Sequence, residues 1–344
     1  MNLLNQTLKG VKMNKLSFFI VSFCLVLAST VVFAETKMSS ASYIKCMEFK
    51  NGDAPNQLCW LAEEDGSPTT GPLVGPMSFI TLPNGNIWIA DTQNVRLCLF
   101  SSEGKNLKEI DFIKLGKSAG LAEMPALADI CLLKNNILLA DANNNLIIDF
   151  NPDNLKMRFF KPSGKEKGNW IQINHIYTDN KDRIYVDDLA SGKIIVLDNN
   201  GGYLGENAAA SIAVSPIDSR MASIHYVESE NGETDSDYYQ LAVNKGFDTP
   251  WFPVVNISSD ENIMQINVIG IDKENNIYVL YGTEFAYFYN VYTFEGELKK
   301  SIETSIVDSG YNPARHKWIN ESGDIFAVTV KDKSLKIMKL VEEN

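Results

Sequence analysis

The chain has 344 residues and carries 43 acidic against 31 basic side chains, a formal net charge of −12 at pH 7. An acidic surface repels the phosphate backbone of nucleic acids and anionic lipid headgroups, so the composition disfavours both as partners. The length alone could suggest two domains. A repeat that extends over most of the chain indicates instead one continuous core.

Residues 1–34 have the pattern of a secretory signal peptide, cleaved before Glu35. Three lysines precede an apolar run over residues 16–27, and Val32-Phe33-Ala34 supplies the cleavage motif. The run is short for a bilayer core of ~30 Å, which needs about 20 apolar residues, so we expect no stable membrane insertion after cleavage. The mature protein is expected to be secreted, to the periplasm or outside the cell.

Four cysteines follow the predicted cleavage site. Cys46 and Cys59 flank a turn that contains Asn51-Gly52, and in an oxidising compartment they are expected to form a disulfide. Cys98 and Cys131 fall in apolar, strand-like runs of different repeats. We expect these two to be buried free thiols.

One unit recurs six times between residues 76 and 340: a polar turn followed by a short apolar strand. The strands are Ile87–Asp91, Ile137–Asp141, Ile184–Asp188, Ile224–Glu228, Ile277–Tyr281 and Ile325–Thr329. A period of roughly 40–50 residues built from short strands is typical of a β-propeller with one four-stranded sheet per blade. The fold expected is therefore an all-β, six-bladed β-propeller.

The first repeat contains four strand-like runs, at residues 76–82, 87–91, 95–100 and 107–112. Asn84-Gly85 between the first two is a strong hairpin signal, since both residues tolerate positive φ. The last repeat contains only three runs and ends at Leu340. We therefore assign residues 76–344 to the propeller and expect residues 35–75 to supply the closing strand, from either Tyr43–Phe49 or Gln57–Ala62.

The first repeat resembles the NHL-type repeats of bacterial secreted proteins. The resemblance is carried by Gly75–Phe79, Asn84–Asp91, and Asn94-Val95-Arg96 followed by Phe100 and Gly104. It continues in the second and third repeats and weakens after them. The fourth repeat departs most, since it carries the acidic insertion 228–237. The resemblance implies a propeller that serves as a binding platform, although some relatives are enzymes.

The innermost strands carry the polar residues from which we predict a site in the central channel. Counting nine residues back from each second-strand isoleucine gives Ser78, Ala128, His175, Ser215, Val268 and His316. Gln172-Ile-Asn174 and Gln265-Ile-Asn267 share one offset, and Arg315 matches the two asparagines. The predicted ligand-binding set is Gln172, Asn174, His175, Gln265, Asn267, Arg315 and His316.

Arg315 decides between two interpretations of this channel. A cation beside amides on an acidic protein favours an anionic ligand, through charge-assisted hydrogen bonds worth ~1.5–3 kcal/mol each. Alternatively, Arg315 pairs with a nearby acid such as Asp129, and the amides serve only backbone groups and water. Asp129 lies one residue out of phase and is expected on the other face of its strand.

The histidines raise a second alternative, which involves a metal. The related peptidyl-hydroxyglycine lyases hold zinc with central histidines, and streptogramin lyases use a propeller histidine. A catalytic zinc needs three protein ligands; His175 and His316 could supply two, whereas His225 lies in a packing position. A calcium-dependent lactonase is matched only in part, by Asn174, Asn267 and Asp129, the last of which lies one residue out of phase. We therefore expect no cofactor; the alternative is one divalent cation in the channel.

Two further features complete the sequence analysis. Asp91, Asp141 and Asp188 recur at one position, with Arg96 or Lys193 five residues after two of them, and are expected to hold turns. Trp251 and Phe252 lie between two prolines in a loop, where they either anchor a partner or fold back on the core.

The function expected from the sequence is non-catalytic binding of a protein, peptide or glycan partner. The motifs of the common catalytic sites, such as Gly-x-Ser-x-Gly or His-Glu-x-x-His, are absent from the sequence. The alternative is a metal-dependent lyase or a lactonase-type hydrolase with its site at the channel mouth.

Overall fold

β-Strands make up nearly all of the regular structure, as the short apolar runs predicted. The computed structural model describes residues 38–63, 69, 74–164, 167–209, 212–227, 238–259, 261–306 and 315–343. The predicted signal peptide and the acidic insertion 228–237 lie outside these residues. No helix in the described ranges is both long enough and apolar enough to span a membrane.

Four groups of strands form separate four-stranded antiparallel sheets. They are β3 (Ser78–Thr81), β4 (Ile87–Asp91), β5 (Arg96–Phe100) and β6 (Asn106–Asp111); β7 (Leu127–Leu133), β8 (Asn136–Asp141), β9 (Leu146–Phe150) and β10 (Met157–Phe160); β11 (Ile173–Thr178), β12 (Ile184–Asp188), β13 (Lys193–Leu197) and β14 (Tyr203–Ala208); and β15 (Ile212–Val214), β16 (Met221–Val227), β17 (Tyr238–Asn244) and β18 (Phe252–Ile257).

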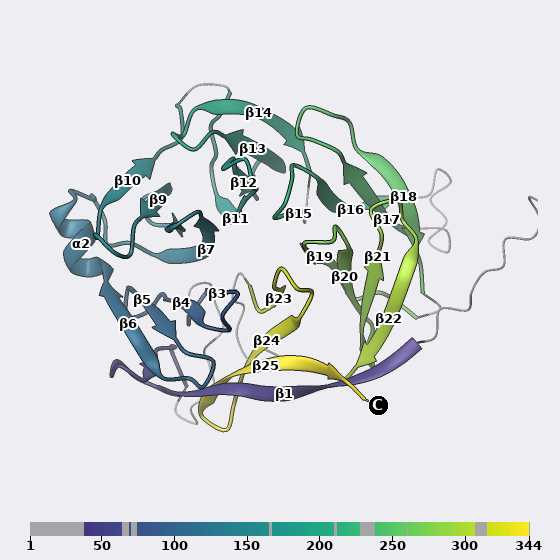
Figure 1. The fold of residues 1–344 in the computed structure, drawn as a ribbon, viewed down its shortest axis with the longest axis horizontal. Helices are drawn as coiled ribbons and strands as arrows, with labels where there is room; N and C mark the ends of the chain where they lie inside the picture. The colour runs from purple at the N-terminus through teal and green to yellow at the C-terminus, as the bar shows by residue number, and fades with distance from the viewer. Residues whose placement is uncertain are drawn as a thin grey trace, which may run out of the picture. The chain divides into compact units, whose positions relative to one another are not determined.

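Two more groups are joined edge to edge in a nine-stranded sheet. The fifth group contains β19 (Gln265–Ile271), β20 (Ile277–Gly282), β21 (Tyr287–Tyr292) and β22 (Leu298–Thr304); the last contains β23 (Lys317–Ile319), β24 (Ile325–Lys331), β25 (Ser334–Glu342) and β1 (Met38–Asn51), with the short β2 (Gln57–Leu58) beside β1. The described strands thus fall into six groups of four. Within Met38–Asn344 the groups follow one another around a centre (Figure 1). The structure is a β-propeller.

β1 completes the last group, as predicted from the missing fourth strand. Ala41 to Lys50 pair antiparallel with β25, from Glu342 to Ser334. Before that, Met38, Ser39 and Ser40 pair in parallel with β22 of the fifth group. Of the two segments proposed for this role, the one that contains Tyr43–Phe49 makes the pairing. β1 therefore links the fifth and last groups as well as closing the last.

The predicted disulfide between Cys46 and Cys59 is wrong, since both are free thiols. Cys46 lies in the middle of β1, whereas Cys59 follows Leu58, the parallel partner of Asn51. Asn51 is five residues beyond Cys46, roughly 16 Å along a strand at ~3.3 Å per residue. A disulfide needs Cα atoms within about 7 Å. Cys98 and Cys131 are buried free thiols, as expected.

The fourth repeat is out of register with the prediction. Its second strand, β16, starts at Met221, which pairs with Val214 in the way that Ile87 pairs with Thr81 in the first group. Ile224 therefore lies three residues inside the strand rather than at its start. Without an Asn-Gly turn before this strand, the sequence offered no marker of where it begins.

All six innermost strands run in the same direction about the centre. Asp129 near the start of β7 bonds Ser78 at the start of β3 and Arg315 just before β23. At the other end, Lys273 N–H bonds the Glu321 carbonyl, which joins the turns after β19 and β23. We call the end where the innermost strands begin the proximal end, and the opposite end the distal end.

One short helix stands apart from the strands. α2 (Phe112–Ser118) follows β6 and begins after Asp111, whose Oδ1 accepts the Ile113 and Lys114 amides at 2.9 and 3.2 Å. A carboxylate at this N-cap position satisfies amides that the first helical turn leaves unpaired. The buried Phe112 packs on Phe150 of the second group, with ring centroids 5.1 Å apart, and so ties the helix to that group.

Candidate functional site

A buried ion pair occupies the proximal end of the centre. Arg315 Nε lies 2.6 Å from Asp129 Oδ1, and its Nη2 lies 2.9 Å from Oδ2. The same Nη2 donates to the Ile176 carbonyl at 2.8 Å, and the guanidinium stacks 4.9 Å from the centre of the Tyr177 ring. The sequence interpretation in which Arg315 pairs with Asp129 is therefore confirmed.

Asp129 is the centre of this network. Besides Arg315, its carboxylate accepts Ser78 Oγ at 2.5 Å and the Ile176 amide at 2.8 Å, and His175 Nδ1 lies 3.5 Å away. The residue is completely buried. Asp129 thus joins the innermost strands of the first three groups to the last, and we call Ser78, Asp129, His175 and Arg315 the central network.

Burial by itself would raise the pKa of Asp129, since a carboxylate loses hydration in a low-dielectric site. The charge of Arg315, together with His175 and the hydrogen bonds, outweighs this and holds the pKa of Asp129 well below its usual range. Burial acts against the charge of Arg315 too, yet Asp129 raises the pKa of Arg315 above its ordinary value. Both groups are therefore ionised in the folded protein.

This network predicts a defined loss of stability in acid. The unfolded pKa of an aspartate is about 3.9, and the folded pKa of Asp129 is lower, so its contribution is present above about pH 4 and is lost as the pH falls through the folded pKa. We expect the gap in unfolding free energy between the wild type and Asp129→Asn to be constant from neutral pH to about pH 5 and to shrink in stronger acid. Urea denaturation across this range measures it.

The control for that experiment is Asp332→Asn, which removes one carboxylate of the same kind from an exposed turn. The difference in unfolding free energy between this variant and the wild type should stay small at every pH. A gap for Asp129→Asn that widens in acid would contradict the assignment of Asp129 as the ionised partner of Arg315.

Asp129 was expected on the other face of β7, and that expectation is wrong. Asp129 pairs with Ala140, as Ser78 pairs with Ala90 and His175 with Asp187. Only four residues separate Leu132 from its partner Ile137, whereas five separate Thr81 from Ile87. Counting nine residues back from Ile137 therefore gave Ala128 instead of Asp129 as the equivalent of Ser78 and His175. Ala128 lies at the bulge in β7 between Leu127 and Asp129.

A bulge also shifts the fifth group by one residue. Val268 pairs with Val279 and Gly270 with Tyr278, which leaves Ile269 as the extra residue. Asn267 consequently pairs with Leu280 and takes the position that His175 has in the third group. Asn174 is itself the extra residue of a bulge in β11, so the predicted match of Asn174 with Asn267 is wrong.

The predicted channel residues have distinct surroundings. Asn174 donates to Asp187 Oδ2 at 2.8 Å, and its loop neighbour Gln172 is exposed while its amide bonds Asp188 Oδ1 at 2.8 Å. Gln265 starts β19 opposite Gly282. His316 is level with His175, because its carbonyl accepts the Val328 amide. Of the seven, Arg315 and His175 meet at Asp129.

The metal alternative needs at least three ligands in one place. In the part of the chain that the structure describes, no group of three or more His, Cys, Asp or Glu side chains is placed to hold an ion. His175 faces the buried Asp129, and His225 stacks edge-on against Trp251 with centroids 5.8 Å apart. Burial lowers the pKa of His225. The described side chains therefore do not fit a catalytic zinc.

The recurrent aspartates hold the loops that lead into the innermost strands. Asp141 Oδ1 accepts the Ala126 amide at 2.9 Å, and Asp188 accepts those of Ile171 and Gln172. Asp91 pairs with Arg96 at 2.8 Å, as expected from their spacing. Lys193 does not follow that pattern: it pairs with Glu206 at 2.8 Å. These buried carboxylates fix the proximal loops.

The predicted partner loop is divided between core and surface. Trp251 Nε1 donates to the Ala208 carbonyl at 2.7 Å, and its ring packs against the hydrophobic cluster between the third and fourth groups. Phe252, the first residue of β18, is half exposed. Trp251 thus folds back on the core, which was one of the two outcomes considered.

The most exposed apolar side chains lie at the proximal end. Met264 and Phe285 are each 72% exposed, before β19 and in the turn after β20. We call the set in proximal loops and strand ends the proximal rim: Leu61, Met124, Ile171, Leu189, Tyr226, Met264, Phe285 and Ile306. At the distal end, the most exposed apolar side chains in turns and at strand ends are Met38, Leu107, Leu155 and Phe252, at 47–51%, whereas six members of the proximal rim exceed that range. Sequence reasoning missed this rim, because loop residues carry no periodic pattern.

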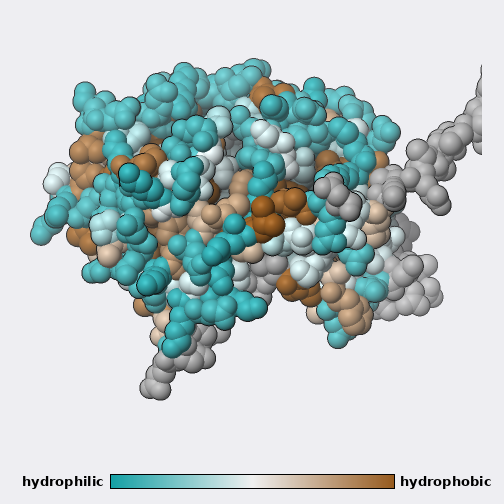
Figure 2. All heavy atoms as spheres, turned by 60° about the horizontal axis from the view of Figure 1, so that its bottom comes forward, coloured by the Kyte–Doolittle hydropathy of each residue, from teal (hydrophilic) through white to brown (hydrophobic). Residues whose placement is uncertain are grey.

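On the side that Figure 2 shows, the described surface is mainly hydrophilic. Figure 2 shows one side of the molecule, where apolar side chains form separate patches between hydrophilic ones. Isolated exposed apolar residues are normal for a soluble protein, whereas a concentration of them marks an interaction surface. The higher exposed fraction of the apolar side chains at the proximal end is therefore the informative feature.

Comparison with known proteins supports the fold. No protein-family model and no curated protein matches the chain. A crystal structure of a DUF4221-family member from Bacteroides vulgatus matches with a TM-score of 0.50 and 12% identity, over 90% of this chain and 100% of that one. A Xanthomonas campestris gluconolactonase has a TM-score of 0.47 and 10% identity over 89% and 99% of the two chains. A streptogramin B lyase matches with a TM-score of 0.46 and 14% identity, over 79% of this chain and 81% of that one. At these identities the similarity concerns the fold alone.

Proposed function

We propose that this protein is a secreted, NHL-like β-propeller that binds a protein or peptide partner through its proximal rim, without catalysis. The observation that carries the proposal is that the six most exposed large apolar side chains of the described residues all lie at one end of the ring of innermost strands. Burial of such residues is the main driving force of protein association. Aliphatic and methionine side chains suit a protein surface better than a sugar ring.

The central network supports a binding role over an anion site in the channel. Arg315 already makes three hydrogen bonds inside the protein, two of them to a carboxylate. A ligand carboxylate would have to displace Asp129, which is completely buried and would be left without its counter-ion. We infer that the network holds the innermost strands together, and that recognition takes place on the loops around it.

The charges beside the rim define the partner more closely. Exposed acids lie within three residues of several rim members: Glu123 precedes Met124, Glu261 precedes Met264, and Glu284 precedes Phe285. A partner with apolar side chains flanked by lysine or arginine would complement both features. Because the predicted signal peptide would export this protein, its partner would lie in the periplasm or outside the cell.

Substitution at the rim tests the proposal. The double variant Met264→Ser/Phe285→Ser is expected to weaken recovery of the partner from the envelope fraction by about tenfold or more, as for residues central to an interface. Both side chains are mostly exposed, so folding should be unaffected. Quantitative affinity capture with tagged wild-type and variant protein measures the change.

The matched control is Leu155→Ser/Ile217→Ser, which removes two exposed apolar side chains from distal turns. It should retain the partner as well as the wild type does. Equal loss in both variants, or reproducible metal-dependent turnover of lactones or peptides by the purified protein, would overturn the proposal.

A further inference from the structure

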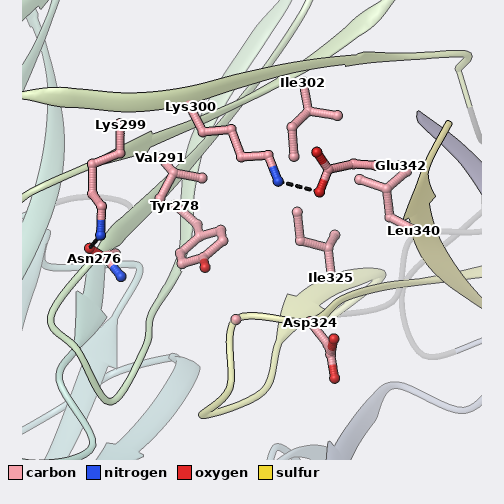
Figure 3. Close-up of a pocket in the computed structure, with 11 residues that line it drawn as sticks. Asn276, Tyr278, Val291, Lys299, Lys300, Ile302, Asp324, Ile325, Leu340 and Glu342 are labelled. Carbon is pink, nitrogen blue, oxygen red and sulfur yellow. Dashed lines mark hydrogen bonds and ion pairs between the residues drawn. The ribbon is translucent and has the colours of Figure 1, made fainter. Parts of the chain in front are cut away.

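A pocket of about 320 Å³ opens between the fifth and last groups, at the distal end and far along the innermost strands from the proximal rim. Its apolar wall is formed by Tyr278, Val291, Ile302, Ile325 and Leu340 (Figure 3). All five belong to the hydrophobic cluster that packs these two groups together. The pocket is thus an unfilled part of a buried interface, with walls made of ordered strands.

The course of β1 accounts for the gap. Ser39 pairs with Ile302 on β22, and two residues later Ala41 pairs with Glu342 on β25. β1 therefore crosses from one group to the other beside the pocket and bridges two sheets that diverge. Further along β1, the Tyr43 and Tyr289 hydroxyls share a short hydrogen bond that closes the interface.

The polar rim of the pocket has two lysines, and they are not equivalent. Lys300 forms an ion pair with Glu342, and the other acid of the lining, Asp324, is paired with Lys339 at 2.9 Å. Lys299 instead donates to the neutral Asn276 Oδ1 at 2.8 Å (Figure 3). Both acids of the lining are therefore neutralised by other lysines, and Lys299 keeps its charge available.

Two acids bond the Nδ2 of Asn276 rather than Lys299: Asp272, and more weakly Glu274 at 3.4 Å. Asp272 Oδ2 accepts Asn276 Nδ2 at 2.8 Å and the Tyr278 hydroxyl at 3.2 Å, while its Oδ1 accepts the amides of Glu274 and Asn276. Asn276 thus separates the lysine from this carboxylate. A second carboxylate brought to Lys299 would meet a cation that an amide, rather than an acid, holds in place.

We propose that this pocket binds a small monocarboxylate with a compact apolar body. The apolar body would lie against Tyr278, Ile302 and Leu340, and the carboxylate would pair with Lys299 at the mouth. The volume is about ten times the ~30 Å³ share of one water molecule, which suits an apolar body of roughly ten heavy atoms. Pockets for small ligands start at about this size. The site is independent of the function proposed for the proximal rim.

Calorimetric titration of the full chain with 4-phenylbutyrate and with its uncharged analogue 4-phenylbutanol tests the proposal. We expect saturable one-site binding of the acid, with the alcohol weaker by about tenfold, the value of one charge-assisted hydrogen bond. Lys299→Gln should weaken binding of the acid by a similar factor and leave the affinity for the alcohol unchanged. Lys299 is exposed, so this variant should fold normally.

Two further variants make the test specific. Lys181→Gln removes an exposed lysine from a distal turn of the third group and should bind like the wild type. Val291→Phe fills the pocket and should abolish binding of both compounds, with the melting temperature as a check on folding. Equal affinity for acid and alcohol, acid binding that Lys299→Gln leaves unchanged, or no saturable binding by the wild type would each overturn the proposal.

Discussion

Replacing Arg315 by alanine is expected to lower the free energy of unfolding by about 3–5 kcal/mol, the cost of leaving a buried charge without its partner. Asp129 would keep its position beneath the surface but lose two of its four hydrogen bonds and its counter-ion. Urea denaturation at neutral pH measures the loss. Binding at the proximal rim should change little wherever the variant remains folded.

A second variant separates the ion pair from simple loss of packing. Removing both charges with Arg315→Met/Asp129→Leu should restore much of the stability, because no unpaired charge remains in the core. If the single variant costs less than about 1 kcal/mol, the network is not a strong structural element. A loss of partner binding by folded Arg315→Ala would move the recognition site into the channel.

Replacing Phe49 by alanine is expected to be as costly, at about 3–5 kcal/mol. Phe49 is 2% exposed on β1, and its ring lies 4.6 Å from that of Phe100 in the first group. Its backbone pairs with Leu335 of β25. The side chain therefore stabilises the junction between the last and first groups, where β1 closes the ring of strands.

The matched control is Ile44→Ala, on the same strand and also paired with β25 but 51% exposed. It should change the free energy of unfolding by no more than about 0.5 kcal/mol. Thermal or urea unfolding of both variants gives the comparison. Similar small effects for both would show that β1 contributes little to stability, contrary to its position in the structure.

The fold could be predicted because local patterns repeat. Four of the six second strands begin at the expected isoleucine and β8 begins one residue before it, at Asn136. Ser334–Leu340 pairs with an N-terminal strand, as the missing fourth strand required. Short apolar strands and polar turns are set by neighbouring residues, so a single sequence displays them. The fourth repeat was misplaced because its turn lacks those residues.

The site was less predictable, because it depends on register. A turn shorter by one residue after β7 and an extra residue in β19 each move a side chain to another position. Such changes are too small to see in a repeat of variable length. Arg315 and Asp129 are 186 residues apart in the sequence. Their pairing was one of two interpretations of Arg315, and the sequence alone offered no ground for preferring it. The rim and the distal pocket depend on tertiary structure alone.

The position of β1 also bears on how the protein matures. Its partner β25 lies about 300 residues further along the chain, so the pairing of Ala41 with Glu342 must wait until β25 has been synthesised. Contacts of such high sequence separation slow folding, because a long loop must be ordered before they form. Until then, β24 and the part of β1 that pairs with β25 present unpaired edges, which invite aggregation. A product truncated before β25 would keep those edges open, so proteolytic quality control could distinguish it from the finished protein.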